Sequence, residues 1–195
     1  MAASIRGNQL KSNWATSKLM AGEGRVADLE AALGPERSRM LAECGRLSWV
    51  PIEVDVALSR AVESVVGEGM AYHRTRRSVA ATMDTTLMRP LLDGARRVFG
   101  LDPRKALKLV KQGWTVVFKD CGHADYECLE DTSAVVRLFD LPEVMLGTPS
   151  YVRAIAGSMH GLLDVCGVEG TTEVLEASLD TRRLELMLEW TRARD

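Results

Sequence analysis

Cys121, His123 and Cys128 are the residues whose types come closest to a metal site, since thiolate and imidazole groups are the usual ligands of zinc. A strand predicted over 123–130 works against a shared site. Side chains of a strand point to opposite faces in turn, and His123 and Cys128 are five positions apart. Buried or half-buried structural thiols are the interpretation we adopt, so no metal ligands are expected.

The other two histidines could serve as a heme ligand or as pH-sensitive groups. His73 stands in GMAYHRTRR, where the neighbouring arginines indicate a solvated or anion-facing stretch. His160 falls on the flank of a predicted helix, so we expect it to be partly exposed, and Asp164 one turn further on could pair with it. The sequence does not place a Ser, Cys or carboxylate partner beside either histidine, so neither supports a catalytic triad. The sequence therefore predicts no catalytic residues.

Basic residues cluster in three places that could converge into an anion-binding patch: 74–77, 96–97 and 104–111. They lack interleaved aromatic residues and any recognised nucleic-acid motif. The formal net charge is -2, so no global field attracts nucleic acid or anionic lipid. A solvated surface is the interpretation we adopt, with nucleic acid as the alternative.

Ala154, Gly157 and Gly161 share one face of a helix predicted from Thr148-Pro149 to about Cys166. Glycine inside a helix costs about 1 kcal/mol relative to alanine, so two of them require a reason in packing. Another backbone could approach closely there, from a helix of the same chain, from the partner subunit of a dimer, or from a ligand. The three residues are our candidates for a subunit interface.

Helical spacing and terminal signals predict most of the remaining elements. Asp102 and Pro103 are a good N-cap and first residue, and Cys121-Gly122 ends that helix. A short strand is expected at residues 4–6. The other expected helices span 8–21, 25–33, 35–44, 51–66, 70–83 and 87–99.

Two hairpins are predicted, and the second is the more informative. The first joins residues 123–130 to 133–140. In the second, Leu184, Leu186, Leu188 and Trp190 alternate with Arg183, Glu185, Met187 and Glu189. On the preceding strand, Leu175, Ala177 and Leu179 alternate with Val174, Glu176 and Ser178. That alternation indicates one buried and one solvated face. A two-stranded hairpin is marginal alone and needs further strands or a helix across its hydrophobic face.

These elements predict an α+β fold, in which several helices precede a strand-strand-helix-strand-strand unit that forms an antiparallel sheet packed on helices. We expect a single domain over 1–195, with an N-terminal helical segment at 1–46 and the α+β core at 47–191. The absence of a long apolar run, of a secretory signal and of paired cysteine motifs favours a cytoplasmic protein with no membrane partner.

Several segments carry a resemblance to a known group: GPERSRMLAE, SWVPIEVDVALSRAVESVVG, KALKLVKQGWTVVFKDCG, SAVVRLFDLPE, SYVRAIAGSMHGLLDVCGVEG and LELMLEW. They resemble a large paralogous family of myxobacterial proteins of similar length and unknown function. Its distinctive positions here are Trp49, Pro51, Trp114, Gly161 and Trp190. That family is similar to the 4-vinyl-reductase-type domain, which is related to heme nitric-oxide sensors and to small subunits of trafficking complexes.

The resemblance implies a small-molecule sensor or an assembly subunit, usually dimeric, rather than a catalyst. Cysteines around the last hairpin can hold a metal in the 4-vinyl-reductase type. Residues 178–190 contain no cysteine, so that metal site is not carried over. No histidine of this chain matches the heme ligand of the sensors.

We therefore predict a non-enzymatic, cytoplasmic regulatory or sensor domain that forms a homodimer and needs no cofactor. A small apolar ligand would lie between the helices and the sheet, near Trp114, Tyr151 and Met159, because ligand pockets are largely apolar with aromatic walls. The alternative is a scaffold subunit with a filled core that binds another protein. An unrecognised enzyme is a third hypothesis.

Overall fold

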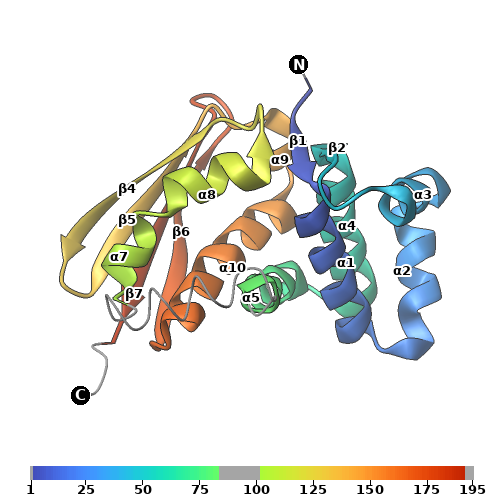
Figure 1. Cartoon of the computed structure of the whole chain (residues 1–195), viewed down its shortest axis with the longest axis horizontal. Coiled ribbons are helices and arrows are strands. Elements are labelled where there is room, and N and C mark those ends of the chain that lie inside the picture. Colours follow the sequence, from blue (N-terminus) through green and yellow to red (C-terminus); the bar gives the residue numbers. More distant parts are fainter. Residues whose placement is uncertain (1, 84–101, 192–195) are drawn as a thin grey trace.

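A four-stranded antiparallel sheet and a group of helices form the two sides of the structure (Figure 1). This arrangement confirms the predicted α+β class. The computed structural model describes residues 2–83 and 102–191. The helix predicted over 87–99 and the basic pair Arg96-Arg97 lie outside the described residues.

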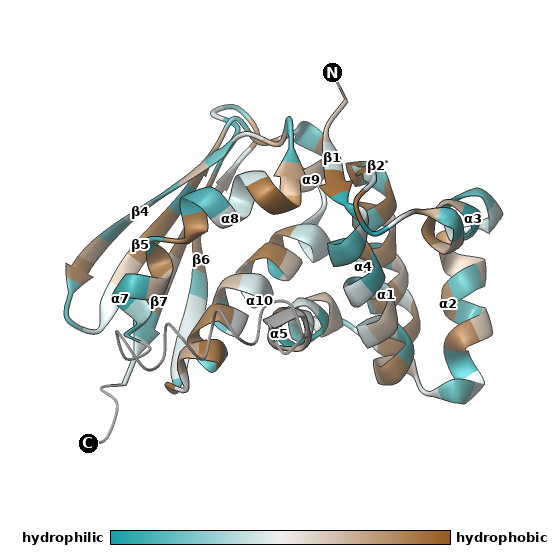
Figure 2. Cartoon of the chain, viewed as in Figure 1, coloured by the Kyte–Doolittle hydropathy of each residue, from teal (hydrophilic) through white to brown (hydrophobic). Residues whose placement is uncertain are grey.

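The N-terminal helices follow the predicted pattern closely. They are α1 (Gly7–Ala21), the short 3-10 helix η1 (Glu23–Arg25), α2 (Val26–Leu33), α3 (Pro35–Glu43), α4 (Ile52–Val66) and α5 (Met70–Met83). Gly34 separates α2 from α3 with a positive φ of 87°, which glycine adopts without strain. These helices carry both hydrophobic and hydrophilic bands (Figure 2), as expected where one side of each helix is buried.

A small sheet connects distant parts of the chain. Its strands are β1 (Ser4–Arg6), β2 (Trp49–Pro51) and β3 (Phe118–Lys119), in the order β2-β1-β3. The sequence predicts β1 but not the other two. Ile5 of β1 pairs with Val50 and Phe118 and is wholly buried. The first strand therefore fixes the N-terminus against a segment more than a hundred residues away.

The helix predicted from residue 103 is interrupted, so the expectation of one continuous helix is wrong. The structure has α7 (Pro103–Leu107) and α8 (Val110–Val117). The predicted cap is confirmed, since Asp102 Oδ1 accepts from the backbone N–H of Arg104 at 2.9 Å. The amide of Leu109 bonds to the carbonyl of Ala106, three residues back, and this tighter turn separates the two helices.

The larger sheet confirms both hairpins. Its strands are β4 (His123–Glu130), β5 (Ser133–Phe139), β6 (Gly170–Ser178) and β7 (Arg183–Trp190), in the order β4-β5-β7-β6. Between the hairpins lie α9 (Glu143–Leu146) and α10 (Pro149–Cys166). Helices α8 and α10 lie on the same side of this sheet (Figure 1). Among the described residues, no helix is long and apolar enough to cross a bilayer.

The two faces of the larger sheet differ as the alternation predicts. Leu184, Leu186 and Leu188 of β7 are wholly buried, and they lie opposite Leu138, Val136 and Ala134 of β5. The other face is mainly polar, although the buried Val135 and its neighbour Met187 also belong to it. There Arg137 donates to Glu127 at 2.8 Å and to Glu185 at 3.1 Å, across three neighbouring strands. The helices therefore cover the apolar face only.

Strand β6 departs from the expectation for its leucines. Leu175 is 48% exposed, and Leu179, which directly follows the strand, is 51% exposed, so the buried face predicted for this strand is wrong. β6 is an edge strand whose register to β7 shifts between Val174 and Glu176, which interrupts the alternation of its side chains. The other edge strand, β4, has a similar shift between Cys128 and Glu130.

The terminal hairpin offers a matched pair of leucines for a stability test. We expect Leu186→Ala to lower the free energy of unfolding by about 2–5 kcal/mol, because it opens a cavity in a closed core. Leu175→Ala should change it by about 0.5 kcal/mol or less, because that side chain is half exposed. Urea unfolding followed by circular dichroism measures both. Equal losses would contradict the arrangement of this hairpin.

Candidate functional site

Helices α5 and α10 approach each other more closely than ordinary side chains allow. A Cβ added at Gly157 would overlap the backbone carbonyl oxygen of Tyr72, and one at Gly161 would lie 2.7 Å from the carbonyl oxygen of Arg76. Real Cβ atoms do not tolerate such distances, so both positions require glycine. The close approach predicted from the small residues of this helix is thus present, and its partner is α5.

Ala154 belongs to the same face of α10. Its carbonyl oxygen accepts a hydrogen bond from Thr75 Oγ1 of α5 at 2.5 Å, and Ala154 itself is 2% exposed. All three candidate interface residues, including Gly157 and Gly161, therefore face a helix of the same chain. Intrachain packing accounts for them, and α5 leaves no room for a partner subunit on this face.

A buried ion pair lies beside this contact. Arg74 of α5 is wholly buried and donates to Asp55 of α4 at 3.1 Å and to Ser59 at 2.9 Å. Asp55 also accepts from Asn13 of α1 at 2.9 Å and from Tyr151 of α10 at 3.1 Å. The expectation that residue 74 belongs to a solvated patch is wrong. The group instead links four helices through one carboxylate.

The chemistry of this buried group favours a structural role. Burial, and next the charge of Asp55, raises the pKa of Tyr151 well above its ordinary value, so the phenol stays protonated. The Nε of Arg74 has no hydrogen-bond partner among the described residues. Removing one member of a buried pair usually destabilises a protein strongly, because the other charge is left uncompensated.

A second polar group crosses the contact between α5 and α10 nearer its exposed side. Arg76 Nε and Nη2 donate to the two carboxylate oxygens of Asp164 at 2.6 and 2.8 Å. The hydroxyl of Tyr72 is hydrogen-bonded to Nδ1 of His160. The bidentate geometry is the strong form of an arginine–carboxylate pair and sets the orientation of the guanidinium.

His160 is 6% exposed, so the expectation of a partly exposed flank position is wrong. The cause is the glycine-permitted approach of α5, which covers this side of α10. Asp164 does lie near it, 3.9 Å from Nε2, but its principal partner is Arg76. Burial, followed by the charge of Arg76, lowers the pKa of His160 below its ordinary value, which favours the neutral ring.

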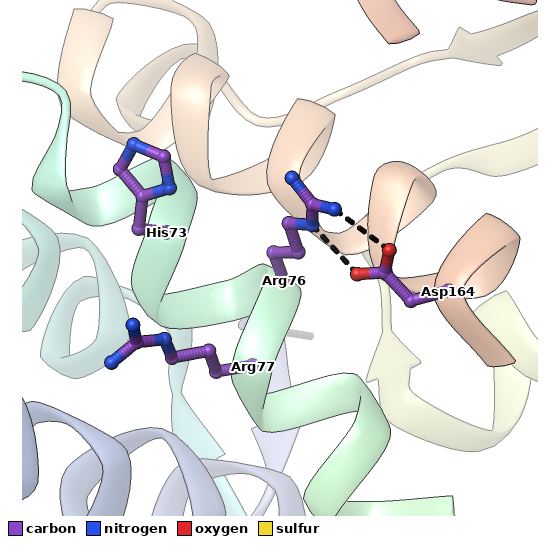
Figure 3. A pocket seen from close by; sticks show the side chains of 4 residues that line it. All are labelled: His73, Arg76, Arg77 and Asp164. Carbon is purple, nitrogen blue, oxygen red and sulfur yellow. Dashed lines mark hydrogen bonds and ion pairs between the residues drawn. The ribbon is translucent and has the colours of Figure 1, made fainter. Parts of the chain in front are cut away.

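A pocket of about 320 Å³ opens at this second group. It is lined by His73, Arg76 and Arg77 of α5 and by Asp164 of α10 (Figure 3). His73 and Arg77 are exposed, whereas Arg76 and Asp164 are about one third exposed at their side chains. His73 lies three and four positions before Arg76 and Arg77 and so neighbours both on the helix surface, whereas the two arginines point apart, Arg76 toward Asp164 (Figure 3). That spacing is visible in the sequence, but the contribution of Asp164 is not.

The three predicted ligand residues occupy separate surroundings. Trp114 is 4% exposed and donates from Nε1 to the carbonyl oxygen of Cys121 at 3.2 Å. Tyr151 bonds to Asp55, and Met159 is buried on α10. None of the three lines the pocket described above, so their role as ligand contacts stays a prediction.

Of the three candidate metal residues only Cys121 is buried; His123 and Cys128 are exposed, so the expectation of a buried or half-buried thiol is wrong for Cys128. His123 pairs with Phe139 across the strands and Cys128 pairs with Ala134, which places them on opposite faces as predicted. Burial raises the pKa of the Cys121 thiol to about 11, which disfavours the thiolate that a metal requires. No group of three or more metal-binding side chains occurs within residues 2–83 and 102–191.

The basic stretch at 104–111 is largely neutralised by neighbouring carboxylates. Arg104 pairs with Asp131 at 2.9 Å, and Lys111 pairs with Asp125 at 2.8 Å. These exposed pairs are typical of a solvated surface and carry little energy.

Solved structures of H-NOX proteins share this fold. The Fe(II) unliganded H-NOX protein from K. algicida has a TM-score of 0.68 at 8% identity, covering 98% of this chain and 99% of the other. The I5F mutant of the T. tengcongensis H-NOX has a TM-score of 0.68 at 12% identity, covering 98% and 100%. An oxygen-binding H-NOX domain related to soluble guanylate cyclases has a TM-score of 0.66 at 12% identity, covering 98% and 100%.

No protein-family model matches the sequence, and no curated protein matches it significantly. The likeness at 8–12% identity is therefore one of fold. It confirms the expected similarity to the heme nitric-oxide sensors at the level of architecture. The chain has the H-NOX-like fold along almost its entire length.

The close helix contact can be tested with two glycines of the same chain. We expect Gly157→Ala to destabilise the protein by about 1–3 kcal/mol, since the added methyl group forces two backbones apart. Gly113→Ala in α8 should instead stabilise it by up to about 1 kcal/mol, because no atom lies near and alanine favours the helix. Thermal or urea unfolding gives both values. A harmless Gly157→Ala would contradict the close approach.

Proposed function

We propose that this chain is a regulatory domain of the sensor type, which binds a small ligand and transmits a conformational change rather than catalysing a reaction. The observation that carries this proposal is the H-NOX-like fold, shared over 98% of the chain with an oxygen-binding H-NOX domain. A fold alone does not determine a function, so the described site must also suit the role.

The position of α10 suits signal transmission. This helix packs along α5 and also contacts α4, α7, α9 and the strands β6 and β7. Small sliding movements of packed helices are a common form of conformational switch. A ligand that shifts α5 relative to α10 would thus be felt by both the helices and the sheet.

A heme does not fit the residues that the structure describes. The chain has three histidines, and residues 84–101 contain none. His160 is hydrogen-bonded to Tyr72, His123 is exposed beside Asp140, and His73 is exposed at the charged pocket. None of them faces an apolar cavity with a free ring nitrogen, as a heme ligand does. We therefore derive no heme-based sensing for this chain.

The use of the polar side chains supports binding rather than catalysis. Asp55, Arg74 and Tyr151 are buried and bonded to one another. The Cys121 thiol is also buried and has a raised pKa. An enzyme would need such groups free to act on a substrate in an open pocket.

The finer expectations remain part of this proposal. They are a homodimer, a cytoplasmic location, and a small apolar ligand near Trp114, Tyr151 and Met159. Because α5 covers Ala154, Gly157 and Gly161, a dimer would have to use another surface.

A scaffold subunit that binds another protein is the second candidate. The observation that favours it is the exposure of Val174 and Leu175 on the edge strand β6 and of Leu179 directly after that strand. Exposed apolar side chains at a sheet edge are one way in which a protein partner is recognised. This alternative requires no ligand in the interior.

The misfit of heme gives a direct prediction. We expect the purified protein to be colourless, and added hemin to produce no sharp Soret band of the kind that axial ligation by histidine gives. The reason is that every histidine is either bonded within the chain or exposed. Absorption spectra of wild type and of His73→Gln with one equivalent of hemin check this. A histidine-ligated spectrum that is lost in His73→Gln would contradict it.

Native mass spectrometry of freshly purified protein separates the two candidate functions. A sensor domain should retain a small molecule, seen as excess mass on a dimer, and hydrophobic metabolites should raise its melting temperature. Saturation at a hundred times Kd corresponds to about 2.7 kcal/mol of stabilisation. If the measured mass equals that of the polypeptide alone and no small molecule raises the melting temperature, the scaffold function is favoured. A monomeric mass would contradict the expected dimer.

A further inference from the structure

We propose that the pocket lined by His73, Arg76, Arg77 and Asp164 binds the carboxylate or phosphate group of a small, freely diffusing molecule. If the bound molecule is the signal, this inference rests on the sensor function proposed above. The binding itself does not depend on that function.

The pocket presents hydrogen-bond donors in excess of acceptors. Arg76 uses two guanidinium N–H groups for Asp164, and Nη1 points away from that carboxylate (Figure 3). Arg77 has neither an ion pair nor a hydrogen bond at its guanidinium within the described part of the chain. Arginine N–H groups match carboxylate and phosphate oxygens in geometry as well as in charge.

The net charge of the pocket also favours an anionic ligand. Two guanidinium groups and one carboxylate line the pocket, so it is net positive even when His73 is neutral. His73 lies one helical turn from each arginine, and a charged imidazole there would be repelled by either guanidinium, at a cost of about a few tenths of a kcal/mol per pair. A bound anion removes that repulsion, whereas a cation or an apolar molecule does not.

Arg76 is held in place before any ligand arrives. Its bidentate pair with Asp164 joins α5 to α10 and fixes the plane of the guanidinium. A group that is already ordered loses less conformational freedom on binding, which increases affinity. Arg77 and His73 are exposed and supply the adaptable contacts.

The size of the pocket limits the ligand. A volume of about 320 Å³ lies at the lower end of the range for small-molecule sites, which is roughly 300–1,000 Å³. A phosphate monoester or a short dicarboxylate fits this limit. A bound anion that accepts from Arg76 Nη1 would add to the pair with Asp164, and so act directly on the contact between α5 and α10.

Calorimetric titration with inorganic phosphate and, separately, with succinate tests the site at constant ionic strength. We expect saturable binding of at least one of the two by the wild-type protein. Arg77→Gln should weaken it about tenfold or more, the loss typical of a charge-assisted hydrogen bond. Arg39→Gln on α3 removes the same charge from an exposed position away from the pocket, and should leave the affinity unchanged.

The imidazole resonances supply an independent readout, because the chain has three histidines and His73→Gln assigns one of them. The His73 signal should shift on titration while that of His123, on the sheet, stays fixed. Binding of phosphate alone identifies a phosphorylated ligand, and binding of succinate identifies a carboxylate.

Equal affinities in wild type, Arg77→Gln and Arg39→Gln would overturn the site, as would no saturable binding of either probe. A protein that ignores both anions yet retains an apolar molecule would overturn this inference and leave the sensor function standing. If the protein binds an anion but shows no change in structure or assembly, the anion site stands and the sensor function is contradicted.

Discussion

The contact between α5 and α10 is the constraint on which the rest of the structure depends. Gly157 and Gly161 let two backbones approach so closely that the polar groups beside them have little freedom. Arg74 is wholly buried beside this contact. Its positive charge is compensated by the carboxylate of Asp55, to which it donates a hydrogen bond. The same approach encloses His160 and brings Arg76 to Asp164. The close contact between α5 and α10 therefore lies behind both the buried ion pair and the charged pocket.

Much of the fold could be predicted from local patterns. Alternating leucines identified β7, and the small residues of α10 correctly indicated that another backbone lies against it. These signals are strong because periodicity reports directly on burial. The strands β2 and β3 were missed because each is too short to show a period, and their pairing depends on β1, far away in the sequence.

The candidate site was less accessible to such reasoning. The basic run after His73 was read as solvated, but a helix turns its side chains to different surroundings, and residue 74 points into the core while residue 77 is exposed. Which arginine is buried depends on the position of Asp55, and no local pattern encodes that position. The likeness to H-NOX structures at 8–12% identity is likewise one of fold, and a shared fold does not determine which polar residues form a site.

The two irregular edges of the larger sheet have a consequence for the protein in a crowded solution. An unbroken outer strand is a template on which further chains can add and grow into fibres. Here the register slips at residues 174–176 on one border and at 128–130 on the other, and glutamates stand at both places. Each slip breaks the row of free amide and carbonyl groups that an incoming strand would need. The register shifts therefore disfavour the addition of a further strand, although one border leaves apolar side chains in contact with water.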